Sequence, residues 1–302
     1  MSTWTVVANA KAGTSEPEAI DEVMAVLGAR HDAELVETAD ADDLAEVLGR
    51  VADGSTVVAL GGDGSLHAVV SVLDDLGRLG DVVVGLVPLG TGNDFARTIG
   101  MDRDDPAAAA AQLLEGEVRS LDLVRDGEGR VVVNAVHVGI GAEAAVEAKP
   151  WKSRLGPVGY AVGAIISGVR ATGFKARVEV DGAVVSHRGR LIQVAVGNGR
   201  YIGGGTPLLP DADPGDGKLD VAVSWADARW RRVGYAWRLR KGRHPHRDDV
   251  QMMRGRRVTV TGQPSRGNLD GEVCHPAATH TWTVEPAAFR MLLPASGQTS
   301  SA

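Results

Sequence analysis

Two glycine-rich segments, each containing an aspartate, hold the residues best suited to chemistry in this chain. Gly61–Ser65 follows the apolar residues 56–60, and Gly90–Asp94 follows the apolar residues 82–87. A strand that ends in glycines and opens into a helix presents bare backbone amides and the positive end of a helix dipole, which together favour phosphate oxygens. Both segments are therefore predicted to be phosphate-binding loops.

The glycines of these loops let backbone amides approach a polyphosphate without obstruction by a Cβ atom. Ser65 is expected to donate a hydroxyl hydrogen bond and to cap the helix that follows it. The residues predicted to bind the nucleotide in the two loops are Gly61, Gly62, Asp63, Gly64, Ser65, Gly90, Thr91, Gly92 and Asn93.

The acids of the two loops, Asp63 and Asp94, indicate Mg²⁺. Helix capping alone would also explain an aspartate at the position of Asp94. Two carboxylates beside a bound triphosphate would repel it, however, and a bridging cation removes the conflict. Because Mg²⁺ keeps several waters and takes few protein carboxylates, we expect an aspartate–water–Mg²⁺ network with Asp122 as its third member. Asp63 and Asp94 are predicted to be catalytic, and Asp94 and Asp122 to serve the metal.

The spacing of apolar residues predicts the elements that position the loops. Apolar side chains recur at helical spacing after the first loop, at Leu66, Val69, Val70, Leu73 and Leu76, which predicts one helix packed on a sheet. A strand, a crossover helix and a parallel strand are almost always right-handed, so both loops are expected at the carboxyl edge of one sheet, where ligands bind.

The two halves of the chain differ in their patterns. Strand and helix patterns alternate over the first 120 or so residues, which predicts a doubly wound, Rossmann-like parallel sheet. Beyond 121–123 the pattern changes to period two between tight turns, which predicts antiparallel strands in a sandwich or open barrel. The predicted strands of this half are 130–138, 174–180, 190–196, 219–224 and 257–261, with helices near 157–171 and 226–240.

The predicted fold class is therefore α/β, with an N-terminal nucleotide domain and a C-terminal antiparallel β-sandwich domain. The first domain is assigned to residues 1–124 and the second, for substrate, to 125–294. The last strand of the second domain is allowed to return to the first domain. Residues 295–302 are expected to be a flexible tail.

Composition limits the class of protein. The chain has 302 residues, of which 44% are hydrophobic and 24% charged, and its single cysteine, Cys274, excludes an internal disulfide. A reducing cytoplasm is the simplest setting. No segment approaches the ~20 apolar residues that span a bilayer, and no signal sequence is expected at the amino terminus. A net charge of −7 argues against a nucleic-acid partner.

One segment has a strong local bias in charge. Arg229–Arg247 contains eight Lys or Arg residues and no Asp or Glu. Trp230, Tyr235 and Trp237 are interleaved among the basic residues. Such a segment is typical of an interfacial patch that docks on anionic lipid, with aromatic rings at headgroup depth. A solvated helix face followed by a basic loop would have the same composition.

Taken together, the motifs resemble those of the bacterial soluble members of the diacylglycerol kinase family, whose catalytic domain is shared with sphingosine and ceramide kinases. GGDGS alone is only moderately specific, because phosphofructokinases and NAD kinases have similar loops, but its combination with GTGNDFAR and a distal DGE is highly specific. The matching segments are NAKAG (9–13), GGDGS (61–65), PLGTGNDFAR (88–97), residues 134–141, YIGGG (201–205), PDADPGDGKLD (210–220) and NLDGE (268–272).

The resemblance assigns further nucleotide contacts. Asn9, Lys11 and Gly13 match another nucleotide loop of the family, and Thr38 matches a threonine that reaches the nucleotide. The first loop departs from the family, which usually has proline after the asparagine and serine before the glycine, where this chain has alanines. It is interpreted as a backbone cradle with less help from side chains.

The resemblance also assigns a second metal site and a base. A turn of the family holds a structural Mg²⁺ through oxygens at the positions of Asp213, Asp216 and the Lys218 backbone, although an Asx-type turn without metal would have the same sequence. Glu272 resembles the general base that accepts the hydroxyl proton in phosphoryl transfer. A hairpin turn at the preceding Asp-Gly is compatible with that role.

The predicted function is an ATP- and Mg²⁺-dependent lipid kinase, most simply one that converts diacylglycerol to phosphatidic acid at a membrane surface. The protein is expected in the cytoplasm with peripheral membrane association, and the resemblance allows a homodimer. The alternatives are a sphingoid, ceramide or other lipid kinase, a soluble-substrate kinase acting on NAD or a sugar, and a nucleotide-binding regulator without catalysis. Two departures from the family favour the regulator without catalysis. They are the altered first loop and residues 139–143, where the family often has an aromatic residue and then aspartate.

Overall fold

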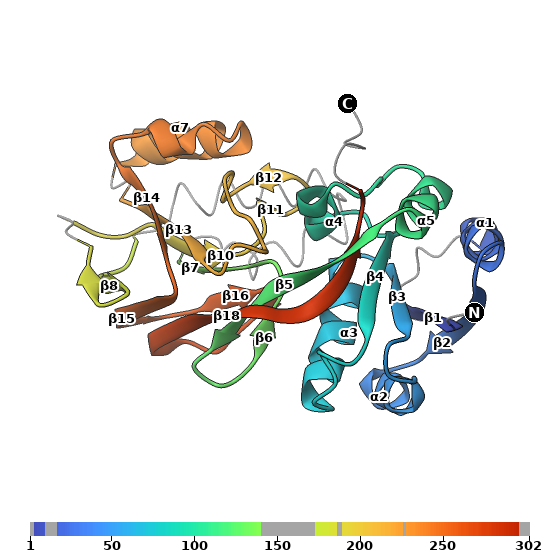
Figure 1. Cartoon of the computed structure of the whole chain (residues 1–302). Coiled ribbons are helices and arrows are strands. Elements are labelled where there is room, and N and C mark those ends of the chain that lie inside the picture. Colours follow the sequence, from blue (N-terminus) through green and yellow to red (C-terminus); the bar gives the residue numbers. More distant parts are fainter. Residues whose placement is uncertain (1–2, 10–16, 140–172, 186–188, 226–227, 296–302) are drawn as a thin grey trace.

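The computed structural model describes residues 3–9, 17–139, 173–185, 189–225 and 228–295 (Figure 1). It has a parallel sheet with helices in its N-terminal part and an antiparallel sheet in its C-terminal part. This arrangement confirms the predicted fold class. The predicted helix at 157–171 lies outside the described residues.

The first lobe is built on four parallel strands in the order β2-β1-β3-β4. β3 and β4 are buried along their whole length, as expected for central parallel strands covered by helices on both faces. The strands are β1 (Thr3–Asn9), β2 (Asp32–Thr38), β3 (Thr56–Gly61) and β4 (Val83–Pro88), and the helices are α1 (Pro17–Gly28), α2 (Ala41–Arg50), α3 (Asp63–Asp75), α4 (Asp94–Ile99) and α5 (Pro106–Leu114).

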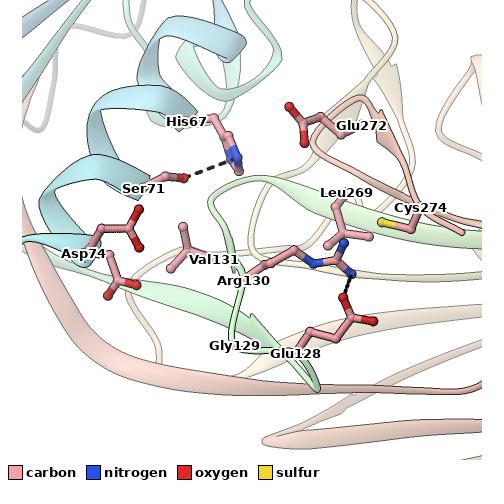
Figure 2. A pocket seen from close by; sticks show the side chains of 11 residues that line it. His67, Ser71, Asp74, Glu128, Gly129, Arg130, Val131, Leu269, Glu272 and Cys274 are labelled. Carbon is pink, nitrogen blue, oxygen red and sulfur yellow. Dashed lines mark hydrogen bonds and ion pairs between the residues drawn. The ribbon is translucent and has the colours of Figure 1, made fainter. Parts of the chain in front are cut away.

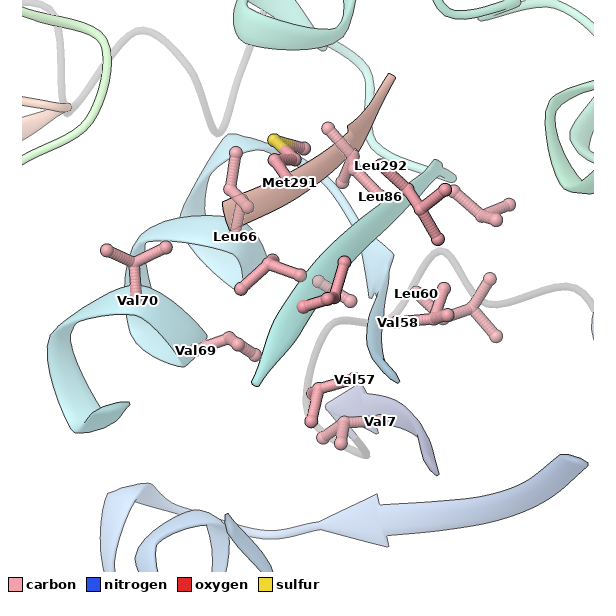
Figure 3. Close-up of a cluster of buried hydrophobic side chains, with 14 of the residues drawn as sticks. Val7, Val57, Val58, Leu60, Leu66, Val69, Val70, Leu86, Met291 and Leu292 are labelled. Atoms are coloured by element: carbon pink, nitrogen blue, oxygen red, sulfur yellow. The ribbon is translucent and has the colours of Figure 1, made fainter. Parts of the chain in front are cut away.

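Helix α3 follows the predicted stripe with one difference. Leu66, Val69 and Val70 are buried, and Figure 3 shows Val69 pointing toward the neighbouring strand. Leu76, which the spacing also placed on this face, comes after the helix ends at Asp75 and is 40% exposed. The apolar repeat extends beyond the hydrogen-bonded helix, so that part of the prediction is wrong.

The second lobe contains an antiparallel sheet in the order β14-β13-β10-β7-β16-β17. Its strands are β7 (Ala135–Gly139), β10 (Gln193–Gly197), β13 (Leu219–Ser224), β14 (Val250–Gly255), β16 (Gly267–Leu269) and β17 (Glu272–Val273). The other elements of this half are β8 (Ala176–Val180), β9 (Ala183–Val184), the hairpin β11 (Tyr201–Ile202) and β12 (Thr206–Pro207), α7 (Arg229–Arg240), η1 (His244–His246) and β15 (Arg257–Ser265).

The last strand, β18 (Ala277–Leu293), belongs to both lobes. It pairs antiparallel with β15 and with β5 (Glu117–Asp126), and it pairs parallel with β4 at Arg290 and Met291. Its first part places Trp282 in the core of the second lobe, and its last part places Phe289 and Met291 in the core of the first. One strand thus supplies apolar side chains to two cores.

The strand predicted at 130–138 is divided in two. The structure has β6 (Val131–Val132) and β7 (Ala135–Gly139), with a break at Val133 and Asn134. The amides of Val133, Asn134 and Ala135 donate to the carboxylate of Asp270 instead of to a neighbouring strand. The period-two pattern could not reveal this interruption, because the acceptor comes from a segment far along the chain.

No helix within the described ranges is long and apolar enough to cross a membrane.

The double role of β18 predicts the effect of a single truncation. Phe289 is 1% exposed, and replacing such a phenylalanine by alanine costs ~3–5 kcal/mol of unfolding free energy. We expect Phe289→Ala to lower the urea midpoint of the whole protein, and Phe289→Leu, which keeps most of the volume, to lower it less. An unchanged midpoint for Phe289→Ala would contradict the assigned core.

Candidate functional site

The two glycine loops meet at the carboxyl ends of β3 and β4, which are parallel neighbours. A Cβ atom built on Gly90 would lie 2.7 Å from the Cα of Gly62, so the two backbones touch where the glycines leave room. The amide of Leu89 donates to the carbonyl of Gly61 at 3.1 Å. The loops therefore lie side by side, as the strand–helix–strand spacing predicted.

The two helices that follow these loops differ in whether a side chain binds the amides of their first turn. Both carboxylate oxygens of Asp63 accept amide hydrogens from the start of α4, from Asp94 at 2.9 Å and Phe95 at 2.8 Å. Helix α3 begins at Asp63 with Gly62 as its N-cap, and no side chain caps it. The expectation that Ser65 caps α3 is therefore wrong, since Ser65 lies inside the helix. The open N-terminus of α3 remains suited to an anion.

Asn93 connects the second loop to α4 in a left-handed conformation, with φ of 49°. Its side-chain amide donates to the carbonyl of Gly90 at 2.6 Å. Its Oδ1 atom is buried and has no hydrogen-bond partner among the described residues. A buried acceptor of this kind normally finds a partner, so it marks a place where a donor from a ligand or water fits.

Asp94 is buried and joins the two lobes. Its carboxylate accepts the amide hydrogens of Gly204 at 2.9 Å and Gly205 at 2.6 Å, both in the turn between β11 and β12. Burial and the nearby charge of Asp63 raise the pKa of Asp94, although these amides lower it. A Cβ on Gly92 would lie 3.3 Å from an oxygen of Asp63 and 3.8 Å from one of Asp94, so the two carboxylates converge.

Asp122 binds backbone amides in this structure, and its role in a Mg²⁺ network stays a prediction. It is buried on β5, and its oxygens accept the amides of Gly217 at 2.6 Å and Ala287 at 2.8 Å. Within the described residues, its side-chain hydrogen bonds reach the 210–218 turn and β18, not Asp63 or Asp94. Its carboxylate holds that turn against β18, which is a structural use of the group.

The 210–218 turn is an Asx-type turn in this arrangement. Asp213 accepts the amide of Gly215 at 3.0 Å, and Asp216 accepts the amide of Lys218 at 3.1 Å while its second oxygen pairs with Arg254. Across the described ranges no three acidic, histidine or cysteine side chains converge as a metal site would require. A structural Mg²⁺ at Asp213, Asp216 and Lys218 stays a prediction.

Asp270 binds backbone and side-chain groups from two distant segments of the chain. Its carboxylate, 3% exposed, accepts the three amides at the break between β6 and β7 and also contacts Nδ1 of His67 at 3.0 Å. The Nε2 atom of His67 lies 3.3 Å from the hydroxyl of Ser71. Burial lowers the pKa of His67, but its hydrogen bond to Asp270 and the charges of Asp270 and Glu272 outweigh burial and raise it.

A cavity of about 370 Å³ separates α3 from the hairpins of the second lobe. Glu272 on β17 and His67 on α3 line it from opposite sides, and Figure 2 shows their side chains facing each other. Two other acids of its lining have cationic partners, since Asp74 pairs with Arg125 and Glu128 with Arg130. The Glu272 carboxylate, in contrast, has no hydrogen bond or ion pair to any residue that the structure describes.

The first predicted loop is only partly described. Asn9 ends β1 beside Thr38 at the end of β2, at the same edge of the sheet as the glycine loops. Thr38 is buried, and its hydroxyl donates to the carbonyl of Ala8 at 3.5 Å. Lys11 and Gly13, together with most of residues 139–143, lie outside the described residues.

Sequence reasoning missed two residues that the structure places in the site. His67 is not among the residues that the sequence predicted for the site, and Asp270 was predicted only as part of a hairpin turn. Asp270 does adopt a turn conformation, with φ of 45°. The available signal was position: His67 lies two residues after the first loop, and Asp270 lies two before Glu272.

Known proteins resemble this chain over almost its whole length. The family model of the diacylglycerol kinase catalytic domain matches residues 3–125, and that of the YegS C-terminal NAD kinase beta sandwich-like domain matches residues 134–293. A diacylglycerol kinase of Mycobacterium tuberculosis is 29% identical, covering 85% of this chain and 84% of the relative. A probable lipid kinase YegS-like of Pseudomonas putida is 34% identical, covering 86% and 83%.

A solved structure has the same fold. The crystal structure of a diacylglycerol kinase from Bacillus anthracis superposes with a TM-score of 0.71 at 19% identity, covering 98% of this chain and 97% of that one.

The contact between the glycine loops predicts opposite effects for two Gly→Ala variants. In Gly90→Ala, the new methyl group would collide with the backbone of Gly62, and such overpacking costs ~1–3 kcal/mol. Gly64, in the first turn of α3, has open space around it, so Gly64→Ala is the matched control and should be neutral or slightly stabilising. Urea unfolding of both variants measures the difference, and equal stabilities would refute the close approach.

The pKa of His67 predicts a pH-dependent contribution to stability. A folded pKa above the ordinary 6.5 means that the pair with Asp270 stabilises the protein fully below about pH 6.5 and loses this effect as pH rises through the folded value. The stability gap between wild type and His67→Gln should therefore shrink as pH rises from 6 to 9. His275→Gln, at an exposed histidine, is the control variant. A stability difference between wild type and His67→Gln that widens as pH rises would contradict the pairing of His67 with Asp270.

Proposed function

The chain belongs to the diacylglycerol kinase family of lipid kinases, and we propose that it transfers the γ-phosphate of ATP to the free hydroxyl of diacylglycerol. The products are phosphatidic acid and ADP. The proposal is carried by one observation: helix α3 has an open N-terminus at the glycine loops, and two turns of the same helix line the cavity that contains Glu272. One helix thus presents the proposed phosphate site at its N-terminus and lines the cavity that the Glu272 side chain, on β17, lines from the other side.

The nucleotide is assigned to the edge of the sheet formed by the ends of β1, β3 and β4. The close approach of Gly62 to Gly90 holds the two glycine loops side by side, and the first turn of α3 offers amides without a capping side chain. The buried Oδ1 of Asn93 is an acceptor in the same place. These features fit a polyphosphate and its polar surroundings.

The donor set near Asp63 and Asp94 fits Mg²⁺ bound through water. Each carboxylate oxygen of the pair accepts one backbone amide and keeps further lone pairs for water molecules. The raised pKa of Asp94 reflects burial and the neighbouring charge of Asp63, which a cation would offset. A bound Mg²⁺ would supply charge neutralisation for the triphosphate.

Glu272 is assigned as the group that accepts the proton of the lipid hydroxyl. The hydroxyl oxygen forms a bond to the γ-phosphorus while the bond to the ADP oxygen breaks, and the hydroxyl proton passes to the carboxylate. The Glu272 carboxylate has no ion pair among the described residues, so its oxygens are available to accept this proton. Asp270, held by three amides and His67, fixes the turn from which Glu272 extends.

A carboxamide variant tests the role of Glu272. We expect Glu272→Gln to lower kcat by about 10²–10⁴-fold, because general-base catalysis contributes that much, with ATP affinity nearly unchanged. Glu128→Gln is the matched control, since Glu128 lines the same cavity but is paired with Arg130. Labelled-ATP assays with diacylglycerol, ceramide, sphingosine, a polyprenol and NAD identify the acceptor. A Glu272→Gln enzyme with more than about a tenth of wild-type turnover would overturn the assignment.

A further inference from the structure

We propose that the outer face of helix α7 docks the protein on the surface of an anionic lipid bilayer. The docking face is defined here as Trp230, Val233, Trp237, Arg238 and Arg240. The proposal names the surface through which the enzyme reaches its substrate, and this purpose rests on the proposed lipid kinase function. The docking itself is a binding event that does not require phosphoryl transfer.

The apolar part of the docking face is exposed to a degree that folding does not explain. Trp230 is 72% exposed, Trp237 57% and Val233 52%. Their spacing of three, four and seven residues places them on one side of the helix. Tryptophan is enriched where one end of a side chain is apolar and the other wet, as at the headgroup level of a bilayer.

Cations surround these apolar side chains. Arg238 and Arg240 are exposed and lie on either side of the apolar row, and neither has an acidic partner among the described residues. Lys241 lies 4.4 Å from the ring centroid of Trp237. Basic residues of this kind gain from the negative potential of an anionic membrane. The combination of exposed tryptophan and unpaired arginine favours anionic lipid over a neutral apolar partner.

The inner face of α7 is fixed to the second lobe. Tyr235 is buried, and its hydroxyl donates to Gln193 on β10 at 2.9 Å. Arg231 faces Asp249, to which Arg247 also binds at 2.6 Å. Arg231 therefore belongs to the attachment of the helix, and its guanidinium also lies 5.3 Å from the ring centroid of Trp230 at the edge of the docking face. Because the helix is anchored this way, truncation of the outer tryptophans leaves the fold intact.

The position of α7 relates docking to the proposed site. The helix lies on the outside of the second lobe, over β13 and β14 (Figure 1). Just beyond its C-terminus, a Cβ on Gly242 would be 3.0 Å from the side chain of Pro207 on β12. The turn that precedes β12 contains the two amides that hold Asp94. The docking face is thus connected by direct packing to the loop that joins the lobes.

A second copy of this chain fits the docking face less well than an anionic bilayer does. Symmetric pairing of two docking faces would bring Arg238 and Arg240 of one copy toward the same cations of the other. Like charges at close range are destabilising, whereas anionic headgroups complement them.

The test is flotation of the full-length chain with vesicles of phosphatidylglycerol and phosphatidylcholine. We expect wild type to bind these vesicles and Trp230→Ala/Trp237→Ala to bind about tenfold more weakly or worse. Arg238→Glu/Arg240→Glu should weaken binding similarly, and pure phosphatidylcholine vesicles should bind wild type poorly. The matched control is Leu76→Ala/Val184→Ala, which removes exposed apolar side chains from α3's end and β9 and should bind like wild type. Thermal melting confirms that each variant is folded.

Two results would overturn the proposal. One is wild-type binding to anionic vesicles that the tryptophan variant retains, and the other is a wild type that does not float at all. Light scattering tests the rival occupant, a second copy of this chain. If wild type were a dimer and the tryptophan variant were not, while both floated equally well, the docking face would be assigned to self-association. Glu272→Gln should float like wild type, so failure of the kinase assignment would leave the docking result readable.

Discussion

The structure depends on buried carboxylates that bind backbone amides across long distances in the sequence. Asp94 holds the turn after β11, Asp122 holds the 210–218 turn and β18, and Asp270 holds the break between β6 and β7. Charge-assisted hydrogen bonds of this type contribute about 1.5–3 kcal/mol each. A buried carboxylate without such partners is strongly unfavourable. The two lobes are therefore locked where these three acids find their amides.

This constraint determines what the site can do. Asp63 occupies the N-terminus of α4, which leaves the N-terminus of α3 as the open anion site. Asp270 fixes the turn before Glu272 and at the same time contacts His67, two residues beyond the first loop. The proposed phosphate site and the proposed base are consequently connected through helix α3. Phosphoryl transfer needs this kind of fixed alignment, because positioning and charge neutralisation supply most of its catalysis.

Strand β18 and helix α7 divide the remaining tasks. β18 contributes Trp282 to one core and Phe289 to the other, so neither core is complete without the end of the chain. Helix α7 contributes Tyr235 to the interior but leaves Trp230 and Trp237 in solvent. The proposed docking face and the proposed catalytic groups thus lie in separate parts of the molecule, and the β11–β12 hairpin contacts both α7 and Asp94.

The sequence by itself determined the local features: the two glycine loops, the stripe of α3, the alternation of strands and helices in the first half and the period-two strands in the second. Glycine content and apolar periodicity are local properties, and they specify which face of an element is buried. Only the tertiary structure decided that Ser65 does not cap α3, that the Asp63 carboxylate binds the first amides of α4, that Asp122 binds amides of the 210–218 turn and β18, and that His67 meets Asp270. That last contact joins residues 203 positions apart. Periodicity gives the direction of a side chain but not its partner, because the partner is brought near only when the whole chain packs.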